Sequence, residues 1–209
     1  MKGGQWVFIK GEAKYMTIRK MFFLFWTTVA LGIVTAPVAS LFVIWVLGSP
    51  GVSFTSILWA GVMFGVVAQM GFFAYLVFNM VAKGFIRNPY IYQALQLLAM
   101  AGVLTWLYQI STRQTGTPGP WVLPLVILGV GVVAAWFKAK ATSRASWIPA
   151  LFFMVVATVL EAIPSLEQNS FPMILLMVLV LLICNAWQMM QLHRLLETGA
   201  GDKQKSRTP

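Results

Sequence analysis

The sequence predicts an all-α integral membrane protein, a bundle of about six transmembrane helices with both termini in the cytoplasm. Hydrophobic residues make up 59% of the 209 residues and charged residues only 10%, whereas a soluble domain is nearer half apolar and a quarter charged. The apolar residues form six long runs, and the basic residues gather between those runs on one predicted side. This composition excludes a soluble enzyme, a disordered chain and a disulfide-rich scaffold.

The lengths of the six runs predict helices. A transmembrane helix needs roughly 20 apolar residues to cross about 30 Å of hydrocarbon, whereas barrel strands alternate in polarity over about 10 residues. Residues 1–196 are therefore expected to form one polytopic membrane domain, followed at 197–209 by a polar, disordered cytoplasmic tail. The six expected spans are about 21–47, 54–81, 90–110, 121–137, 147–164 and 171–190.

Each span is delimited by its flanking residues. The first follows a basic segment but is longer than the 7–15 residues, roughly, of a signal-peptide core, so we expect an uncleaved anchor, kinked at Pro37. Short loops separate the first span from the second (48–53), the third from the fourth (111–120) and the fifth from the sixth (165–170). Pro149 is expected to open the fifth span and Pro164 to end it.

The distribution of basic residues predicts the orientation. The chain has 15 Lys and Arg against 5 Asp and Glu, a net charge of +10. Fourteen of the 15 basic residues fall in the N-terminal segment, the second and fourth loops and the tail, and only Arg113 falls on the other side. Cytoplasmic loops carry the excess of Lys and Arg, so both termini are predicted inside the cell, in the plasma membrane. Anionic lipid headgroups are the expected partner of these charges, and nucleic acid is not.

Small residues at four-residue spacing predict close helix packing. Such spacing lets two backbones approach closely, either within the chain or against a partner's transmembrane helix. Both alternatives stay open from the sequence. The residues are Gly32, Ala36 and Ser40 in the first span, Gly61 and Gly65 in the second, and Gly131 and Ala135 in the fourth.

Glu161 is the acidic residue inside a predicted span, and it is the first candidate for function. It lies roughly 20 Å along the helix from Ile148, in the outer half of the span. One alternative is an interfacial carboxylate that is hydrated or hydrogen-bonded at a helix end. The other is a buried switch or a ligand contact, because ionisable groups in hydrocarbon are costly and often functional.

Other polar residues within the spans are candidates for interhelical hydrogen bonds or for a polar pathway. Asn185 and Gln188 share one face of the sixth span with Cys184. His193 is the one histidine, and with a single cysteine the chain offers no metal-ligand cluster. We therefore expect no metal, no cofactor and no enzymatic activity. The functional candidates are Glu161, Pro149, Pro164, Asn185 and Gln188.

Two stretches resemble a known family. Residues 147–164, which contain Glu161, and residues 184–195, which run from Cys184 past His193, are similar to the KinB-signalling-pathway activation (KbaA-like) proteins of spore-forming Gram-positive bacteria; residues 17–28 are similar more weakly. The resemblance implies a polytopic membrane protein that supports signalling by a membrane sensor histidine kinase at the start of the sporulation phosphorelay. It implies no catalytic residues.

Two functions follow as expectations. The first is a membrane accessory that activates a sensor histidine kinase through intramembrane contact, which requires only different affinities for two kinase conformations. The alternative is a small transporter or ligand sensor that uses Glu161 and the intramembrane Gln and Asn side chains. The sequence leaves the oligomeric state open.

Overall fold

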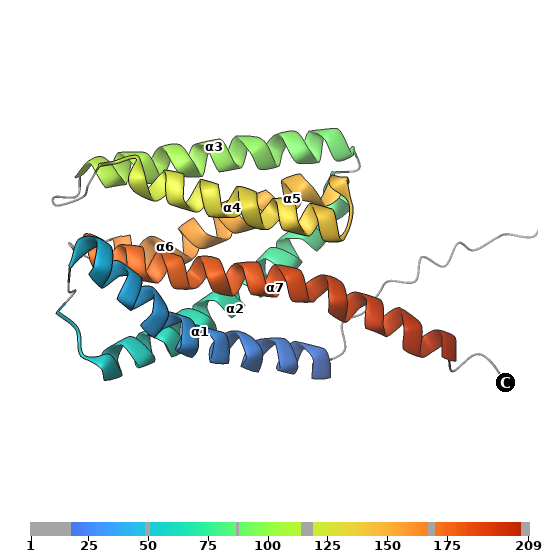
Figure 1. Ribbon diagram of the computed structural model, residues 1–209. Coiled ribbons are helices and arrows are strands. Elements are labelled where there is room, and N and C mark those ends of the chain that lie inside the picture. The colour runs from blue at the N-terminus through green and yellow to red at the C-terminus, as the bar shows by residue number, and fades with distance from the viewer. Residues whose placement is uncertain (1–17, 49–50, 87, 114–118, 167–169, 206–209) are drawn as a thin grey trace, which may run out of the picture.

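The computed structural model is an all-helical bundle (Figure 1). It describes residues 18–48, 51–86, 88–113, 119–166 and 170–205, and the side chains of 18, 19, 145 and 193–205 lie outside the description. The elements are α1 (Ile18–Leu47), α2 (Phe54–Phe85), α3 (Pro89–Arg113), α4 (Val122–Ala141), η1 (Arg144–Ser146), α5 (Trp147–Phe152), η2 (Phe153–Ala157), α6 (Thr158–Leu166) and α7 (Phe171–Lys205).

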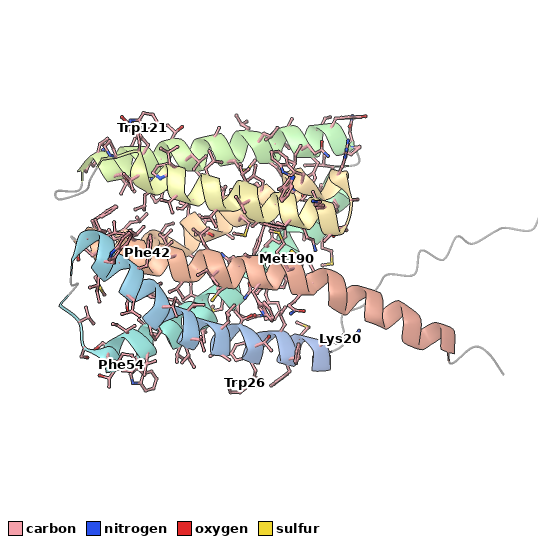
Figure 2. The ribbon with its side chains drawn as sticks, viewed as in Figure 1. Lys20, Trp26, Phe42, Phe54, Trp121 and Met190 are labelled. Atoms are coloured by element: carbon pink, nitrogen blue, oxygen red, sulfur yellow. The ribbon has the colours of Figure 1, made fainter. Side chains whose placement is uncertain are left out.

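Six helical segments of the described chain are long and apolar enough to cross a membrane. This confirms the prediction of six apolar helices, with α5, η2 and α6 together forming the fifth. The fifth segment ends at Leu166, two residues beyond the predicted boundary, because Pro164 is accommodated inside α6. Lys20 lies at one end of the bundle, and Phe54 and Trp121 lie at the other (Figure 2).

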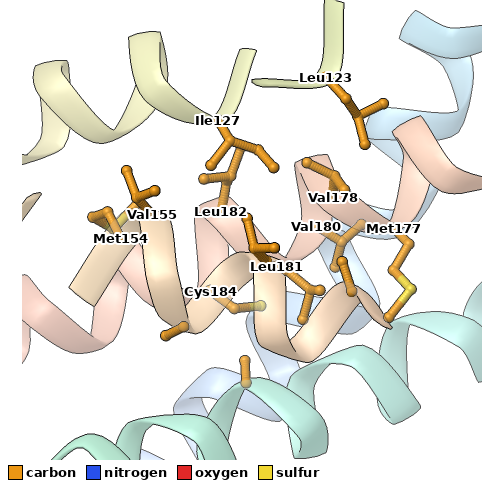
Figure 3. Close-up of a cluster of buried hydrophobic side chains, with 14 of the residues drawn as sticks. Leu123, Ile127, Met154, Val155, Met177, Val178, Val180, Leu181, Leu182 and Cys184 are labelled. Atoms are coloured by element: carbon orange, nitrogen blue, oxygen red, sulfur yellow. The ribbon is translucent and has the colours of Figure 1, made fainter. Parts of the chain in front are cut away.

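Two segments form the centre of the bundle. Over the most apolar 18 residues of each segment, 67% are buried in the fifth segment and in α7, against 22–33% in the other four. α7 contacts α1, α2, α4 and α6. Figure 3 shows side chains of α4, η2 and α7 meeting in this core, among them Ile127, Val155 and Leu182. The outer helices expose large apolar side chains instead, as expected where lipid replaces water.

The predicted small residues lie at contacts within the chain. A Cβ on Gly32 would collide with the carbonyl oxygen of Gly61, and a Cβ on Gly65 would lie 2.9 Å from Val29 Cα. The α1 and α2 backbones therefore touch at their crossing. Ala36, Ser40 and Ala135 are buried, and Gly131 faces Leu151 and Val155 of the fifth segment. These faces are filled by the chain's own helices and are not free for a partner's helix.

Two helices are irregular. α1 bends near its middle (Figure 1), and it contains Pro37, whose ring removes a helix hydrogen bond. The fifth segment contains a five-residue π-helix, η2. The backbone of α7 stays helical to Lys205 and extends past the other helices (Figure 1). A short polar helix is only marginally stable in water unless it packs against other elements. The helical backbone up to Lys205 therefore does not decide whether the tail at 197–209 is disordered, and that disorder stays a prediction.

Candidate functional site

A polar cluster lies inside the bundle, where α6 meets α7 and α2. Asn185 is fully buried and donates through Nδ2 to Glu161 Oε2 at 2.8 Å and to Thr158 Oγ1 at 3.1 Å. Glu161 is only 7% exposed. Burying a carboxyl group costs free energy unless hydrogen bonds replace those it made to water. The hydrogen bond from Asn185 offsets part of this cost for Glu161.

The depth of Glu161 differs from the predicted one. Its partner Asn185 lies in the half of the α7 span nearer Leu192, and its neighbour Gly71 lies close to the middle of α2. The carboxyl group therefore lies beside the middle of α2, and of the two forms expected for a carboxylate at a helix end, hydrated or hydrogen-bonded, the structure has the hydrogen-bonded one. The helix position of Glu161 alone suggested the outer half, but its long side chain reaches the middle of the bundle.

Gly71 is the residue that makes room for the carboxyl group. A Cβ at this position would overlap Glu161 Oε1 and lie 2.7 Å from its Cδ. The sequence reasoning missed Gly71, because it has no small residue four positions away to mark it as a packing glycine. Its role becomes visible only in the structure, where the packing of α2 against α6 places Gly71 opposite the Glu161 side chain.

A second polar pair joins α7 to α2. Gln188 Nε2 donates to Gln69 Oε1 at 3.0 Å, and both side chains are buried. The thiol of Cys184 points toward the Thr28 carbonyl oxygen of α1, at 4.0 Å. The three polar residues of α7 thus reach three different helices, and α7 is the element that links the bundle through polar contacts.

Several polar atoms of this interior have no hydrogen-bond partner among the described residues. They are Glu161 Oε1, Asn185 Oδ1, Gln188 Oε1, Gln69 Nε2 and both side-chain polar atoms of Gln96. Buried polar atoms without partners are uncommon and call for an explanation by water, an ion or a ligand. Two of these atoms, Glu161 Oε1 and Asn185 Oδ1, are hydrogen-bond acceptors that belong to the polar cluster.

The π-helix η2 directly precedes Thr158 and Glu161. π-helical turns of this kind occur often at functional sites, because they change which side chains face a neighbouring helix. Tyr75 of α2 donates to the Pro149 carbonyl oxygen at 3.2 Å, and its ring lies 4.7 Å from that of Phe153. Pro149 thus helps to anchor the fifth segment on α2. The sequence carries no recognisable signal for η2.

The remaining predicted candidates lie apart from this cluster. Pro164 lies one turn beyond Glu161 in α6, near Ser165, whose hydroxyl group donates to Met177 Sδ of α7. The side chain of His193 lies outside the described residues. No group of three or more potential metal ligands is present in the described part of the chain.

Comparison with known proteins identifies relatives. The sequence model of the KbaA family, described as KinB-signalling pathway activation in sporulation, matches residues 29–195. The KinB-signaling pathway activation protein of Bacillus subtilis (strain 168) is 33% identical over 153 residues, which are 69% of this chain and 77% of that protein. No solved structure matches the chain. The family match includes Gly71, Glu161 and Asn185.

Proposed function

Because this chain belongs to the KbaA family, we propose that it promotes signalling by the KinB sensor histidine kinase at the start of the sporulation phosphorelay. It acts without an enzymatic reaction of its own, as a multi-pass protein of the plasma membrane that contacts the kinase within the bilayer. The observation that carries the proposal is the family match over most of the bundle.

The distribution of charge and of apolar surface supports the membrane part of the proposal. The six apolar segments expose large side chains such as Trp45, Trp59 and Leu98. Most of the basic residues lie before α1 and in its first turn, in and just after the last turn of α2, and in and just after the last turn of α4. By the positive-inside rule, the end of the bundle that holds Lys20 faces the cytoplasm, together with both termini.

An accessory of this kind activates a kinase by binding its active conformation more tightly than its inactive one. The small-residue faces of α1, α2 and α4 are filled within the chain, so the contact uses another face. Over the most apolar 18 residues of each segment, α3 buries the smallest share, 22%. Its Gly102 meets nothing within 4 Å, so a partner helix can approach α3 closely there. We assign the kinase contact to this face of α3.

Spore counts test the proposal. In the native host, with KinB as the main input to the phosphorelay, deletion of the gene is expected to cause a large loss of heat-resistant spores. A constitutively active downstream regulator should restore them. Gly102→Leu should reproduce the loss, whereas Gly84→Leu, at a glycine of α2 that also meets nothing within 4 Å, should not. Normal sporulation of the deletion strain would refute the proposed function.

A further inference from the structure

An apolar groove lies between α2 and the fifth helical segment. It has a volume of about 630 Å3. Three of its wall residues, Met70, Phe78 and Leu160, are more than half exposed, so the groove opens on the outer surface of the bundle, where lipid would lie. Its deeper walls come from Phe153, Ala157 and Glu161 of the fifth segment and from Gly71 of α2.

Glu161 brings a polar atom without a partner to this apolar wall. Oε2 accepts the hydrogen bond of Asn185, but Oε1 has no partner among the described residues. Oε1 occupies the space that a Cβ of Gly71 would take, and Gly71 is itself a wall residue of the groove. Because the last torsion of a Glu side chain is broad, a small rotation presents this oxygen to a group bound in the groove.

We propose that this groove is a binding site for an amphipathic ligand that enters from the bilayer, with an apolar body and one hydrogen-bond-donating head group, an amine or a hydroxyl. The apolar body fills the space between α2 and η2, and the head group donates to Glu161 Oε1. The volume falls within the range of about 300–1,000 Å3 of small-molecule sites, which are mostly apolar with a few placed polar groups.

The chemistry of the groove favours this occupant over the others. Water is a poor occupant, because a bound water molecule needs about two to four hydrogen-bond partners and the walls of this groove are almost entirely apolar. A lipid acyl chain can fill the groove but leaves Oε1 unpaired. A partner's transmembrane helix can cover the mouth at Met70 and Leu160, but the acceptor is buried beside Gly71, so a helix backbone at the mouth would not pair with it. A slender molecule with a terminal donor satisfies both the apolar walls and the oxygen.

The site lies where binding can affect the whole bundle. Glu161 is hydrogen-bonded to α7, and α7 contacts five other helical elements, α1, α2, α4, η2 and α6. Occupation of the groove would hold η2 against α2 and fix the position of the carboxyl group that α7 binds. Regulation of KinB by such binding rests on the proposed function. Binding of a ligand in the groove does not depend on it.

A stability measurement with defined probes tests the binding. The purified full chain is placed in phosphatidylcholine nanodiscs, and its Tm is followed by tryptophan fluorescence with dodecylamine, dodecanol or dodecane added at equal mole fraction. The amine and the alcohol should raise Tm by about 5 °C at saturation and dodecane by much less, because a ligand that binds only the folded state stabilises it.

Matched variants locate the effect. Ala74→Phe fills the groove from its exposed mouth and should abolish the Tm shift, whereas Ala101→Phe, at an exposed alanine of α3 outside the groove, should keep it. Glu161→Gln keeps a similar shape but removes the charge, so the Tm shift with the amine should fall below the shift with the alcohol, because an amide oxygen still accepts a hydrogen bond but no longer pairs with an ammonium group. A cooperative unfolding transition in the absence of probe shows that each variant is folded.

Three outcomes would overturn the proposal. Equal shifts for dodecane, dodecanol and dodecylamine would show that no donor is recognised. Unchanged shifts in Ala74→Phe would place binding elsewhere, and crosslinking of KinB to Leu160 with no probe effect would assign the groove to the kinase. Because the Tm measurement contains no kinase, a negative result there does not affect the spore-count test, and a negative spore-count test does not affect the binding result.

Discussion

Glu161 and Asn185 form the most consequential pair of side chains in the structure. The 2.8 Å hydrogen bond between them joins α6 to α7 in the interior of the bundle. A buried polar group that loses its partner costs about 1–3 kcal/mol, whereas replacing both partners by apolar groups can be nearly neutral. The pair therefore allows a direct test of whether the cluster is present primarily for stability or for function.

A double-mutant cycle measures this pair. Asn185→Leu alone should lower the free energy of unfolding by about 1–3 kcal/mol, because it leaves the Glu161 carboxyl group without its hydrogen bond. The double variant Glu161→Leu, Asn185→Leu should recover most of that stability yet still lose KinB activation. Thermal unfolding in nanodiscs and spore counts measure the two effects; equal stability of the single and double variants would contradict the pairing.

At the scale of elements, the six apolar runs and the starts of the second to sixth were predictable from the sequence, whereas several helices end beyond the predicted spans. The start of α2 at Phe54 and the start of α7 at Phe171 agree with the predicted positions, because the flanking loops are short and polar. The π-helix η2 was not predictable, since a shift from α to π hydrogen bonding depends on packing against α2 and α4. The depth of the Glu161 side chain depends on the same packing.

The crossing of α1 and α2 is the element contact that depends most on glycine. Gly32→Ala or Gly61→Ala should destabilise the bundle by about 1–3 kcal/mol, because the new Cβ meets the partner's backbone. Gly129→Ala in α4 meets nothing within 4 Å and should be neutral or slightly stabilising. Thermal unfolding of the three variants checks the contrast; destabilisation by Gly129→Ala of the same size would contradict it.

At the scale of the whole molecule, the proposed orientation depends on charge alone. The described helices place the start of α1 and the later part of α7 on the same end of the bundle (Figure 1). Among the residues that the structure describes, helix packing is the same in kind at both ends, so it does not set the orientation. The basic segments supply that distinction through the positive-inside rule.

Cysteine labelling tests this orientation against a low background. The natural Cys184 is buried and should not react. In intact cells, Ser53→Cys, between α1 and α2, should react with a membrane-impermeant maleimide, whereas Ser143→Cys, after α4, should react only after permeabilisation. Both positions are exposed, so the comparison reports the side of the membrane. The reverse pattern would invert the topology and contradict the charge argument.

The most direct test of kinase activation is the autophosphorylation rate of purified KinB in nanodiscs, measured with and without this chain in the same disc. We predict a higher rate with the natural chain and with Gly84→Leu, and little or no increase with Gly102→Leu, which blocks the proposed α3 contact. A rate that is the same with and without the natural chain would contradict activation by direct contact within the membrane.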